Sequence, residues 1–381
     1  MKVGIVVPYS WSFWGGVPEH AQHQARALEE LGIEARTLIG YDPPGLLTRV
    51  LHPRAGRAES PPAGLIPTGR SAIVPANGAL PNVVLDPRAF FRVRSALERE
   101  RFDLLHVHEP LAPVACVAAL ALARTPLVGT FHASGELGWM KAARPLWGFL
   151  AERLDYRIAV SCAAREAAAR YLGGEYELIP NGVAIPPHVD VARREHHVVF
   201  VGRHEPRKGL EVLLRAWPEV HARTGARLRL VGADPLWVRL LLSRRRLPET
   251  GIDLLGTVGD EELTAELLAA KALAAPSLGG ESFGMVLTRA FACGTPVVAS
   301  DIPGYRDVMA GEVGALVPPG DVPALAQTLA AIVADERRRR TLAANARRLA
   351  EERYAWPDIA RRLAAIYELV VRGSSATRAA A

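Results

Sequence analysis

The sequence has few cysteines and no long apolar run, and both shortages exclude classes of protein. Its only cysteines are Cys116, Cys162 and Cys293, and no C-x-x-C pair occurs. A scattered, odd set builds no disulfide framework, so we expect a reduced cytosolic compartment. The longest clean apolar run, residues 111–123, is too short to span a bilayer. Residues 3–7 form an apolar strand pattern, and no signal-peptide cleavage pattern follows them.

Familiar signatures of nucleotide and metal sites are missing too. No G-x-G-x-x-G fingerprint follows the first strand pattern, and no D-x-D pair is present to hold a metal on a nucleotide diphosphate. Lysine occurs only at Lys2, Lys141, Lys208 and Lys271, so arginine carries nearly all of the net charge of +6. A basic excess of this size permits binding to phosphates, nucleic acid or anionic lipid.

The pattern of apolar runs predicts the fold class. The chain has 381 residues, 49% of them hydrophobic and 23% charged, which is enough for two globular domains. Short apolar runs alternate with helical patterns, which predicts βαβ units and an α/β class of two doubly wound halves joined by a linker at 181–188. Residues 41–82 show only weak periodicity, as in a long connection. Strands are expected at 3–7, 33–39, 102–107, 127–131, 157–160 and 177–179, and then at 197–201, 227–231, 252–255, 272–275, 296–299 and 315–317.

Residues 276–301 read as strand, glycine loop, helix and strand. Gly279-Gly280 would let the backbone approach a ligand closely, and the next helix would direct unpaired N–H groups at phosphate oxygens. Glu281 adds a carboxylate that accepts hydrogen bonds from hydroxyls. Together these groups suit a sugar nucleotide. The alternative is an ordinary helix start with Ser282 as the N-cap.

Two further loops carry groups that suit a phosphate. Arg203, Arg207 and Lys208 follow the first strand pattern of the second half. Without a D-x-D pair, a planar guanidinium and a compact ammonium would have to neutralise a diphosphate, although a solvated basic turn remains an alternative. Gly15-Gly16 follows the first strand pattern and opens a helix, which suits a phosphate or a reacting sugar.

Aromatic residues crowd the loop before Gly15. Tyr9, Trp11, Phe13 and Trp14 would be costly in a solvent-facing loop unless they touch a second domain, a lipid or a sugar face. A basic helix pattern at 88–101 with adjacent phenylalanines predicts contact with an anionic membrane surface, and an ordinary surface helix is the alternative.

The histidines form a third group. His106, His108 and Glu109 lie at the end of one strand pattern, and His132 ends the next. Three histidines and a carboxylate could bind zinc. Neutral histidines that donate hydrogen bonds are favoured over zinc, and a purely structural role is open for His106.

In their joint order and spacing, these stretches resemble the retaining glycosyltransferases of family 4, over essentially the whole chain. The resemblance is greatest to the bacterial phosphatidylinositol mannosyltransferases. The matching stretches are Pro8-Tyr9-Ser10 with Gly15-Gly16-Val17, Leu105-His106-Val107-His108-Glu109-Pro110, Thr130-Phe131-His132, Ile158-Ala159-Val160-Ser161, Ile179-Pro180-Asn181-Gly182-Val183, Gly202-Arg203 with Glu205-Pro206-Arg207-Lys208-Gly209, and Gly280-Glu281-Ser282-Phe283-Gly284.

The resemblance implies a GT-B fold, with two Rossmann-like domains facing across a cleft and a C-terminal helix crossing back. Residues 1–183 with helix 357–372 would form the acceptor-side domain, and residues 184–356 the donor-nucleotide domain. The implied reaction moves a hexose, mannose from GDP-mannose, to a lipid-linked or polyol acceptor such as phosphatidylinositol. It needs no metal or other cofactor and no nucleic acid. The expected location is cytoplasmic, peripheral on the inner face of the cell membrane.

The resemblance also assigns roles to individual residues. The protein's part in such a reaction is to position the acceptor and to stabilise the diphosphate charge as it develops. By resemblance, Arg203 and Lys208 hold the donor diphosphate, Glu281 meets sugar hydroxyls, the backbone of Phe283, Gly284 and Met285 lines the donor, Gly16 lies near the phosphate and the transferring sugar, and His132 lies beside the reacting centre.

Two departures from the family pattern leave rival functions open. The family has a second Glu eight residues after the first, which normally binds the ribose hydroxyls, and Arg289 stands there instead. Arginine only donates hydrogen bonds, although it could add a cation near the phosphates. The loop at 76–82 keeps Asn77-Gly78 but lacks the neighbouring tyrosine and arginine. The rivals are a degenerate sugar-nucleotide or lipid-binding relative with little catalysis, and a soluble transferase with a small acceptor.

Overall fold

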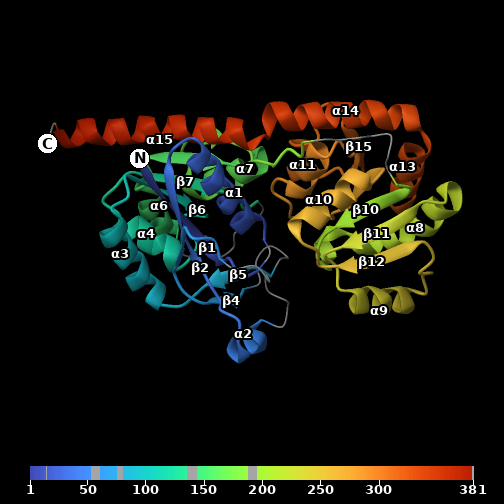
Figure 1. Cartoon of the computed structure of the whole chain (residues 1–381), viewed down its shortest axis with the longest axis horizontal. Coiled ribbons are helices and arrows are strands. Elements are labelled where there is room, and N and C mark those ends of the chain that lie inside the picture. Colours follow the sequence, from blue (N-terminus) through green and yellow to red (C-terminus); the bar gives the residue numbers. More distant parts are fainter. Residues whose placement is uncertain (14, 53–60, 75–79, 135–143, 188–194, 380–381) are drawn as a thin grey trace. The chain divides into compact units, whose positions relative to one another are not determined.

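The computed structural model describes residues 1–13, 15–52, 61–74, 80–134, 144–187 and 195–379. Trp14 and most of the loop at 76–82 lie outside these ranges. The chain divides into two compact units, which are drawn in Figure 1 and described separately here. Unit 1 consists of Met1–Gly182 with Trp356–Ala381, and unit 2 of Val183–Ala355.

Unit 1 contains a parallel sheet with the order β3-β2-β1-β6-β7-β8-β9. Val3, Ile5, Val6 and Val7 of β1 are fully buried, as expected for a strand covered on both faces. The strand order reverses between β1 and β6, and the carboxyl edge at such a reversal is where ligands bind in open α/β sheets. The strands are β1 (Lys2–Ser10), β2 (Glu34–Gly40), β3 (Leu65–Pro67), β4 (Ser71–Ile73), β5 (Asn82–Val84), β6 (Leu104–His108), β7 (Leu127–Phe131), β8 (Tyr156–Ala159) and β9 (Glu177–Leu178).

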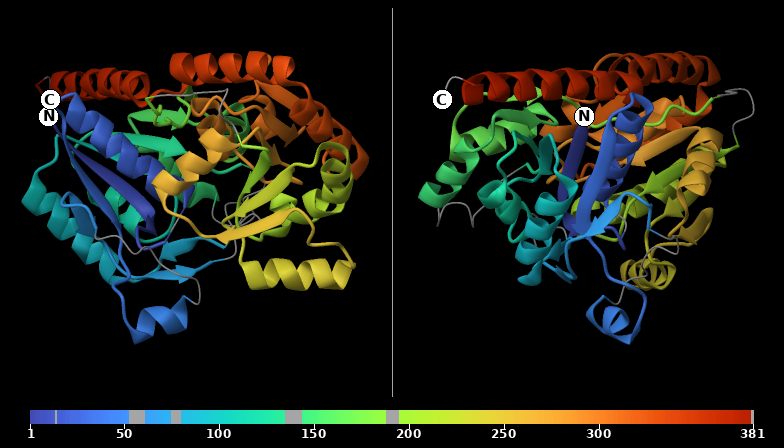
Figure 2. Two further views of the ribbon diagram at one scale, coloured as in Figure 1. Left: turned by 45° about the vertical axis from the view of Figure 1, so that its right-hand side comes forward. Right: turned by 60° about the vertical axis from the view of Figure 1, so that its left-hand side comes forward.

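Helices cover both faces of the unit 1 sheet. The last helix packs beside the first, and Ile359, Leu363 and Tyr367 join the core between them and the sheet (Figure 2). The opposite face is filled from a helix that is almost entirely alanine and leucine, residues 115–122. The helices are α1 (Gly16–Glu30), α2 (Leu46–Leu51), α3 (Arg88–Glu100), α4 (Ala115–Leu122), α6 (Arg144–Glu152), α7 (Cys162–Leu172) and α15 (Trp356–Ala379).

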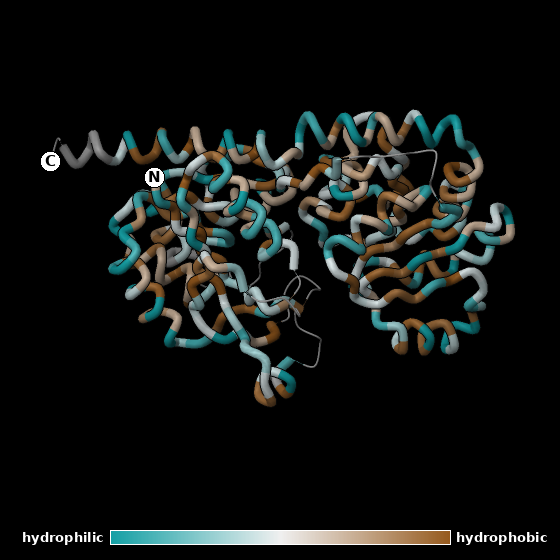
Figure 3. Tube along the Cα trace, in the orientation of Figure 1, coloured by the Kyte–Doolittle hydropathy of each residue, from teal (hydrophilic) through white to brown (hydrophobic). Residues whose placement is uncertain are grey.

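Unit 2 repeats this plan with the order β12-β11-β10-β13-β14-β15, and all of its strand pairs are parallel. Its strands are largely apolar (Figure 3), and the order reverses between β10 and β13. The elements are β10 (His197–Val201), a 3₁₀ turn η2 (Pro206–Lys208), α8 (Leu210–Thr224), β11 (Arg227–Val231), α9 (Pro235–Arg245), β12 (Ile252–Gly256), α10 (Asp260–Ala269), β13 (Ala272–Ala275), α11 (Met285–Ala292), β14 (Val297–Ser300), α12 (Pro303–Arg306), β15 (Gly314–Val317), α13 (Val322–Ala334) and α14 (Glu336–Arg353).

The prediction of two doubly wound α/β halves is confirmed, and the ends of the expected strands lie within three residues of the observed ones. Residues 41–82 differ from the long connection that was expected. In their described part they contain a short helix, α2, and the strands β3 and β4, and β5 begins at Asn82. Strands of three residues are too short to show a hydrophobic period, which is why the pattern was weak.

Trp11 and Phe13, from the aromatic loop before Gly15, pack inside unit 1. Trp11 and Phe13 are only 3% and 5% exposed. The Trp11 ring lies 6.4 Å from that of Tyr41, and the Phe13 ring lies 4.5 Å from that of His52. The expectation that these two rings touch another domain, a lipid or a sugar is therefore wrong. Among the described residues, no helix is both long and apolar enough to cross a bilayer.

Candidate active site

In unit 2, the loops that follow β10 and β13 are locked together at the carboxyl edge of the sheet. Leu278 donates its backbone N–H to the carbonyl of Arg207 at 2.7 Å. Gly209 has a φ of 69°, and a Cβ placed on it would lie 1.8 Å from the carbonyl oxygen of Pro276. Only glycine fits there, so the basic loop is held against the glycine turn at residues 276–284.

Charged side chains from the two loops meet at this edge. Lys208 Nζ lies 2.7 Å from Glu281 Oε1, and an Arg207 nitrogen lies 2.6 Å from the same oxygen. Glu205 pairs with Arg207 at 2.9 Å and with Arg203 at 2.8 Å. Three cations therefore share two carboxylates, and the edge keeps an excess of positive charge that an anion could neutralise. We call Arg203, Glu205, Arg207, Lys208 and Glu281 the charged edge.

The helix that follows the glycine turn begins without a side-chain cap. α11 starts at Met285, and its N-cap is Gly284, with a φ of 80° and no capping side chain. The alternative in which Ser282 caps this helix is therefore wrong. A Cβ on Gly284 would lie 2.6 Å from the Tyr305 ring, which explains the glycine. An uncapped helix start beside cations is a favourable place for phosphate oxygens.

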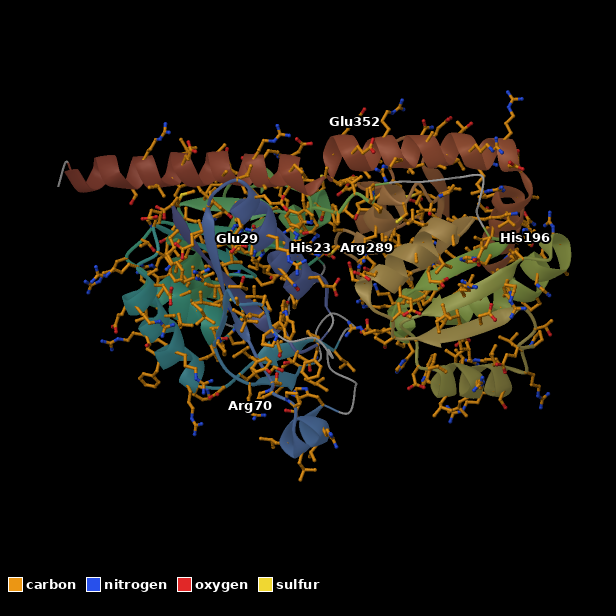
Figure 4. All side chains as sticks on the ribbon, in the orientation of Figure 1. His23, Glu29, Arg70, His196, Arg289 and Glu352 are labelled. Carbon is orange, nitrogen blue, oxygen red and sulfur yellow. The ribbon has the colours of Figure 1, made fainter. Side chains whose placement is uncertain are left out.

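Arg289, labelled in Figure 4, extends from α11. Its guanidinium forms an ion pair with the carboxylate of Asp260, the first residue of α10. The arginine that replaces the family's second Glu is thus placed next to a carboxylate from a different element. Hydrogen-bond acceptors remain at this corner although the sequence position has lost them.

In unit 1, buried histidines gather at the carboxyl edge. The rings of His106 and His108 on β6 stack at 4.6 Å with an interplanar angle of 11°. His108 Nδ1 lies 2.8 Å from Nε2 of His132, which follows β7. His20 of α1 approaches His108 and His132 edge-on at 5.4 and 5.3 Å. We call these four buried residues the histidine cluster.

The histidine cluster is neutral near pH 7. Burial lowers the pKa of His106 and of His132 to about 3. Burial is also the main cause that holds the pKa of His20 and of His108 well below 6.5. Neutral imidazoles donate and accept single hydrogen bonds, so this edge suits hydroxyl groups better than phosphates.

A soft divalent cation is the other ligand to consider. His20, His108 and His132 each place one nitrogen within 4.8 Å of the other two. Neither His106 nor Glu109 belongs to this group, so the structure does not bring together, among the described residues, the four zinc ligands that were considered from the sequence. The hydrogen bond between His108 and His132 already occupies one nitrogen of each ring, which favours the hydrogen-bonding role.

His106 is held on both sides of its ring. Its Nε2 lies 2.6 Å from Thr130 Oγ1, and its Nδ1 lies 2.5 Å from the hydroxyl of Tyr367 and 2.9 Å from Gln24 Nε2. The structural role that was left open for His106 accounts for both nitrogens. Tyr367 belongs to α15, so the last helix is tied directly to the histidine cluster.

Gly15 and Gly16 open α1 at the same edge. Gly15 is extended, and a Cβ placed on it would meet only Pro18 at 3.5 Å. The fold therefore does not demand glycine at position 15. Gly16 is exposed, and α1 has no side-chain cap, so the backbone of this turn is open to a ligand.

The sequence was compared with protein families and with individual proteins. Residues 14–185 match the model of Glycosyltransferase Family 4, and residues 195–335 match that of Glycosyl transferases group 1. The phosphatidyl-myo-inositol mannosyltransferase of Mycobacterium leprae is 36% identical over 395 residues, covering 100% of both chains. The chain belongs to glycosyltransferase family 4. The protein of the same name from Mycolicibacterium smegmatis is 34% identical, over 97% of this chain and 94% of that one.

Solved structures support the GT-B fold of this glycosyltransferase. Sucrose-phosphate synthase from Thermosynechococcus elongatus superposes with a TM-score of 0.75 at 22% identity, over 98% of this chain and 99% of that one. The Anabaena protein HepE in complex with UDP and glucose gives a TM-score of 0.72 at 24% identity, over 97% of this chain and 99% of that one.

The site residues predicted from the sequence lie at the carboxyl edges of the two sheets of the glycosyltransferase. Unit 2 brings Arg203, Lys208 and Glu281 together with the turn that contains Phe283, Gly284 and Met285. Unit 1 places His132 and Gly16 at its own carboxyl edge. Sequence reasoning missed His20, and it gave no role to Glu205 or Arg207, which hold the charged edge together.

Proposed function

We propose that this enzyme is a retaining mannosyltransferase that moves mannose from GDP-mannose to a phosphatidylinositol acceptor. The full-length similarity to phosphatidyl-myo-inositol mannosyltransferases supports the sugar and the acceptor. One structural observation carries the donor site. Lys208, Arg207 and Glu281 meet within 2.7 Å beside an uncapped helix start, which suits a diphosphate next to sugar hydroxyls.

In the proposed reaction, unit 2 binds the donor. Arg203 and Lys208 hold the diphosphate, and the backbone of Phe283, Gly284 and Met285 lines it. The acceptor hydroxyl attacks the sugar carbon on the face from which the diphosphate leaves. The sugar–phosphate bond breaks, and the proton of the hydroxyl moves to the departing phosphate oxygen. Side-chain cations stabilise the developing charge, so we propose that no metal is required.

Unit 1 serves the acceptor and the transferring sugar in this proposal. Gly16 presents an open backbone turn. His132 is neutral, because burial lowers its pKa to about 3, and a neutral imidazole can donate a hydrogen bond to a hydroxyl without competing for the diphosphate. The proposal therefore assigns residues 1–183 with helix 357–372 to the acceptor and residues 184–356 to the donor.

We place the enzyme at the inner face of the cell membrane, peripherally bound through residues 88–101. Phe91 on α3 is 68% exposed, next to the basic residues of that helix. Several of its arginines pair with neighbouring carboxylates, such as Arg94 with Glu98 at 2.9 Å. Flotation with phosphatidylinositol vesicles tests this placement: the wild type is expected to float, and Phe91→Ser with Arg88→Ser to remain in solution. Equal flotation of both would remove α3 as the contact.

The experiment that tests the function is a transfer assay with radiolabelled GDP-mannose and phosphatidylinositol, with and without a chelator. We expect a labelled mannolipid in both conditions, and less product from UDP-glucose. If other nucleotide sugars are used and GDP-mannose is not, the donor assignment is wrong. If inositol alone is glycosylated and the lipid is not, the enzyme is a transferase with a small acceptor.

The degenerate-relative alternative rests on Arg289. This side chain is paired with Asp260, so the corner where the ribose would bind retains a carboxylate. That observation supports nucleotide binding, which both the enzyme and the degenerate relative require. Neither transfer nor hydrolysis of any nucleotide sugar, in a protein that binds GDP, would favour the degenerate relative.

A further inference from the structure

Two consecutive residues at the end of β6, His108 and Glu109, each form a hydrogen bond with His132. We propose that His108 and Glu109 are positioning residues for His132, His108 through the ring and Glu109 through the backbone. The consequence for activity rests on the proposed function, in which His132 contacts the reacting sugar. The two contacts with His132 do not depend on the proposed function, because they lie within unit 1.

Glu109 turns its side chain back towards β7 through an unusual backbone. Its φ is 49°, a left-handed conformation that side chains other than glycine, asparagine and aspartate rarely adopt. Its N–H donates to the carbonyl of Thr130, and its own carbonyl accepts from Ala112, both at 2.8 Å. The carboxylate then accepts the backbone N–H of His132 at 2.8 Å. The strained residue thereby fixes the start of the loop after β7.

His108 sets the tautomer of the His132 ring. Its Nδ1 lies 2.8 Å from His132 Nε2, and its other nitrogen is buried with no partner among the described residues. A buried N–H without an acceptor costs more than a buried lone pair without a donor. The proton of His108 therefore sits on Nδ1 and is donated to His132 Nε2. The proton of His132 is left on Nδ1, where it can be offered to a hydroxyl.

The ring of His108 is itself held by neighbours. It stacks on His106, whose two nitrogens are bonded to Thr130 and to Tyr367 of α15. Truncating His108 would remove a hydrogen bond that orients His132 and leave these supporting contacts in place. A purely structural role for His108 predicts a loss of stability without any change in the tautomer of His132.

The test combines kinetics with nitrogen-15 spectra of histidine-labelled enzyme, in which the two ring nitrogens report the tautomer. The variants are His108→Leu, which removes the donor, and His108→Asn, whose amide places a donor near the position of Nδ1. We expect His108→Leu to lower kcat about 10- to 100-fold with an unchanged KM for the donor, as for other partners that orient a functional imidazole. It should also move the His132 proton away from Nδ1, and His108→Asn should restore both.

The matched control is His197→Leu. His197 is a buried histidine in unit 2. It is the first residue of β10 and therefore lies at the opposite end of the strand from the charged edge. This variant should leave the His132 signals and kcat unchanged. If His108→Leu leaves the His132 tautomer unchanged, the role of His108 is refuted.

The Glu109 half is tested by Glu109→Leu and Glu109→Gln. Glutamine keeps an oxygen that accepts the His132 N–H, and leucine does not. We expect kcat to fall with leucine and to recover most of its value with glutamine; equal losses in both would refute the backbone role. If the wild type transfers no sugar, the proposed function fails. The tautomer measurement on the His108 variants still shows whether His108 positions the ring of His132.

Discussion

The carboxyl edges of the two sheets occupy the same topological position in their units and carry opposite kinds of polar side chain. The charged edge of unit 2 joins three cations to two carboxylates, none of them more than 37% exposed. The histidine cluster of unit 1 contains no ion near pH 7, because burial lowers the pKa of every member. The strand order decides where a site can form, and the residues just after each strand decide what it binds.

The glycines at the two carboxyl edges also differ in their role. At the charged edge, Gly209 is required because its position is left-handed and in contact with Pro276. At the histidine cluster, Gly15 is extended and has room for a side chain. Glycine thus builds the fold of one edge, and in the other it leaves space for a ligand.

The largest expected effect is on stability. Gly209→Ala should lower the free energy of unfolding by roughly 3 kcal/mol or more, because the new Cβ would lie 1.8 Å from the Pro276 carbonyl oxygen. Gly225→Ala is the matched control, since its φ of 68° is nearly the same but nothing lies within 4 Å, and it should lose about 1 kcal/mol. Gly15→Ala should lose the least stability of the three, because a Cβ there would meet only Pro18 at 3.5 Å. Urea unfolding measures all three, and equal losses for Gly209 and Gly225 would contradict the contact.

A change at Glu281 should move affinity and activity in opposite directions. Glu281→Gln removes one of two carboxylates that share three cations, so GDP should bind several-fold more tightly. Transfer should fall about 10- to 100-fold, because a strong acceptor for the sugar hydroxyls is lost. Calorimetry and the transfer assay report the two quantities. If GDP affinity and the transfer rate rise together or fall together, Glu281 does not contact the sugar hydroxyls.

Much of this comparison was visible in the sequence, and the remainder was hidden for physical reasons. Arg203, Lys208 and Glu281 follow buried strands directly, so parallel topology alone predicts that they meet. His20 lies on a helix, and its only signal was a polar residue four positions before Gln24 on an apolar face. Tyr367 joins the cluster from the last helix, 261 residues after His106, and no spacing rule reaches that far.

The two kinds of edge should also differ in their response to pH. Burial raises the pKa of Glu109 to about 7 from 4.5, so its contribution to stability is fully present below pH 4.5 and is lost as the pH rises through 7. The histidines act in the opposite direction: their contribution is present above pH 6.5 and is lost as the pH falls towards 3.

Glu109→Gln isolates the pH-dependent contribution of Glu109 to stability. Relative to the wild type, the variant should gain about 3 kcal/mol of stability between pH 4.5 and pH 7.5. Thermal unfolding across this range measures the difference. Glu100→Gln is a control that should show little pH dependence in this range, because a hydrogen bond from Lys2 lowers the pKa of Glu100 and its contribution to stability therefore changes below pH 4.5. A difference for Glu109→Gln that does not depend on pH would mean that Glu109 is ionised throughout.

The smallest expected effect concerns Arg289 and Asp260. Arg289→Ala should cost about 0.5–1 kcal/mol, as is usual for an ion pair near the surface. Arg289→Glu should cost more, because it sets two carboxylates side by side. The exchange of Arg289→Glu with Asp260→Arg should recover the loss. Failure of the exchange to recover stability in thermal unfolding would show that the pair contributes little.

The central claim is that side-chain cations take the place of a metal in holding the donor diphosphate, and GDP binding measured by calorimetry in excess EDTA tests it most directly. We predict that the wild type and the control Lys271→Ala bind GDP equally well under these conditions, and that Lys208→Ala binds at least about 10-fold more weakly while keeping its fold. Unchanged GDP affinity in Lys208→Ala, or binding by the wild type only when a divalent ion is restored, would contradict the claim.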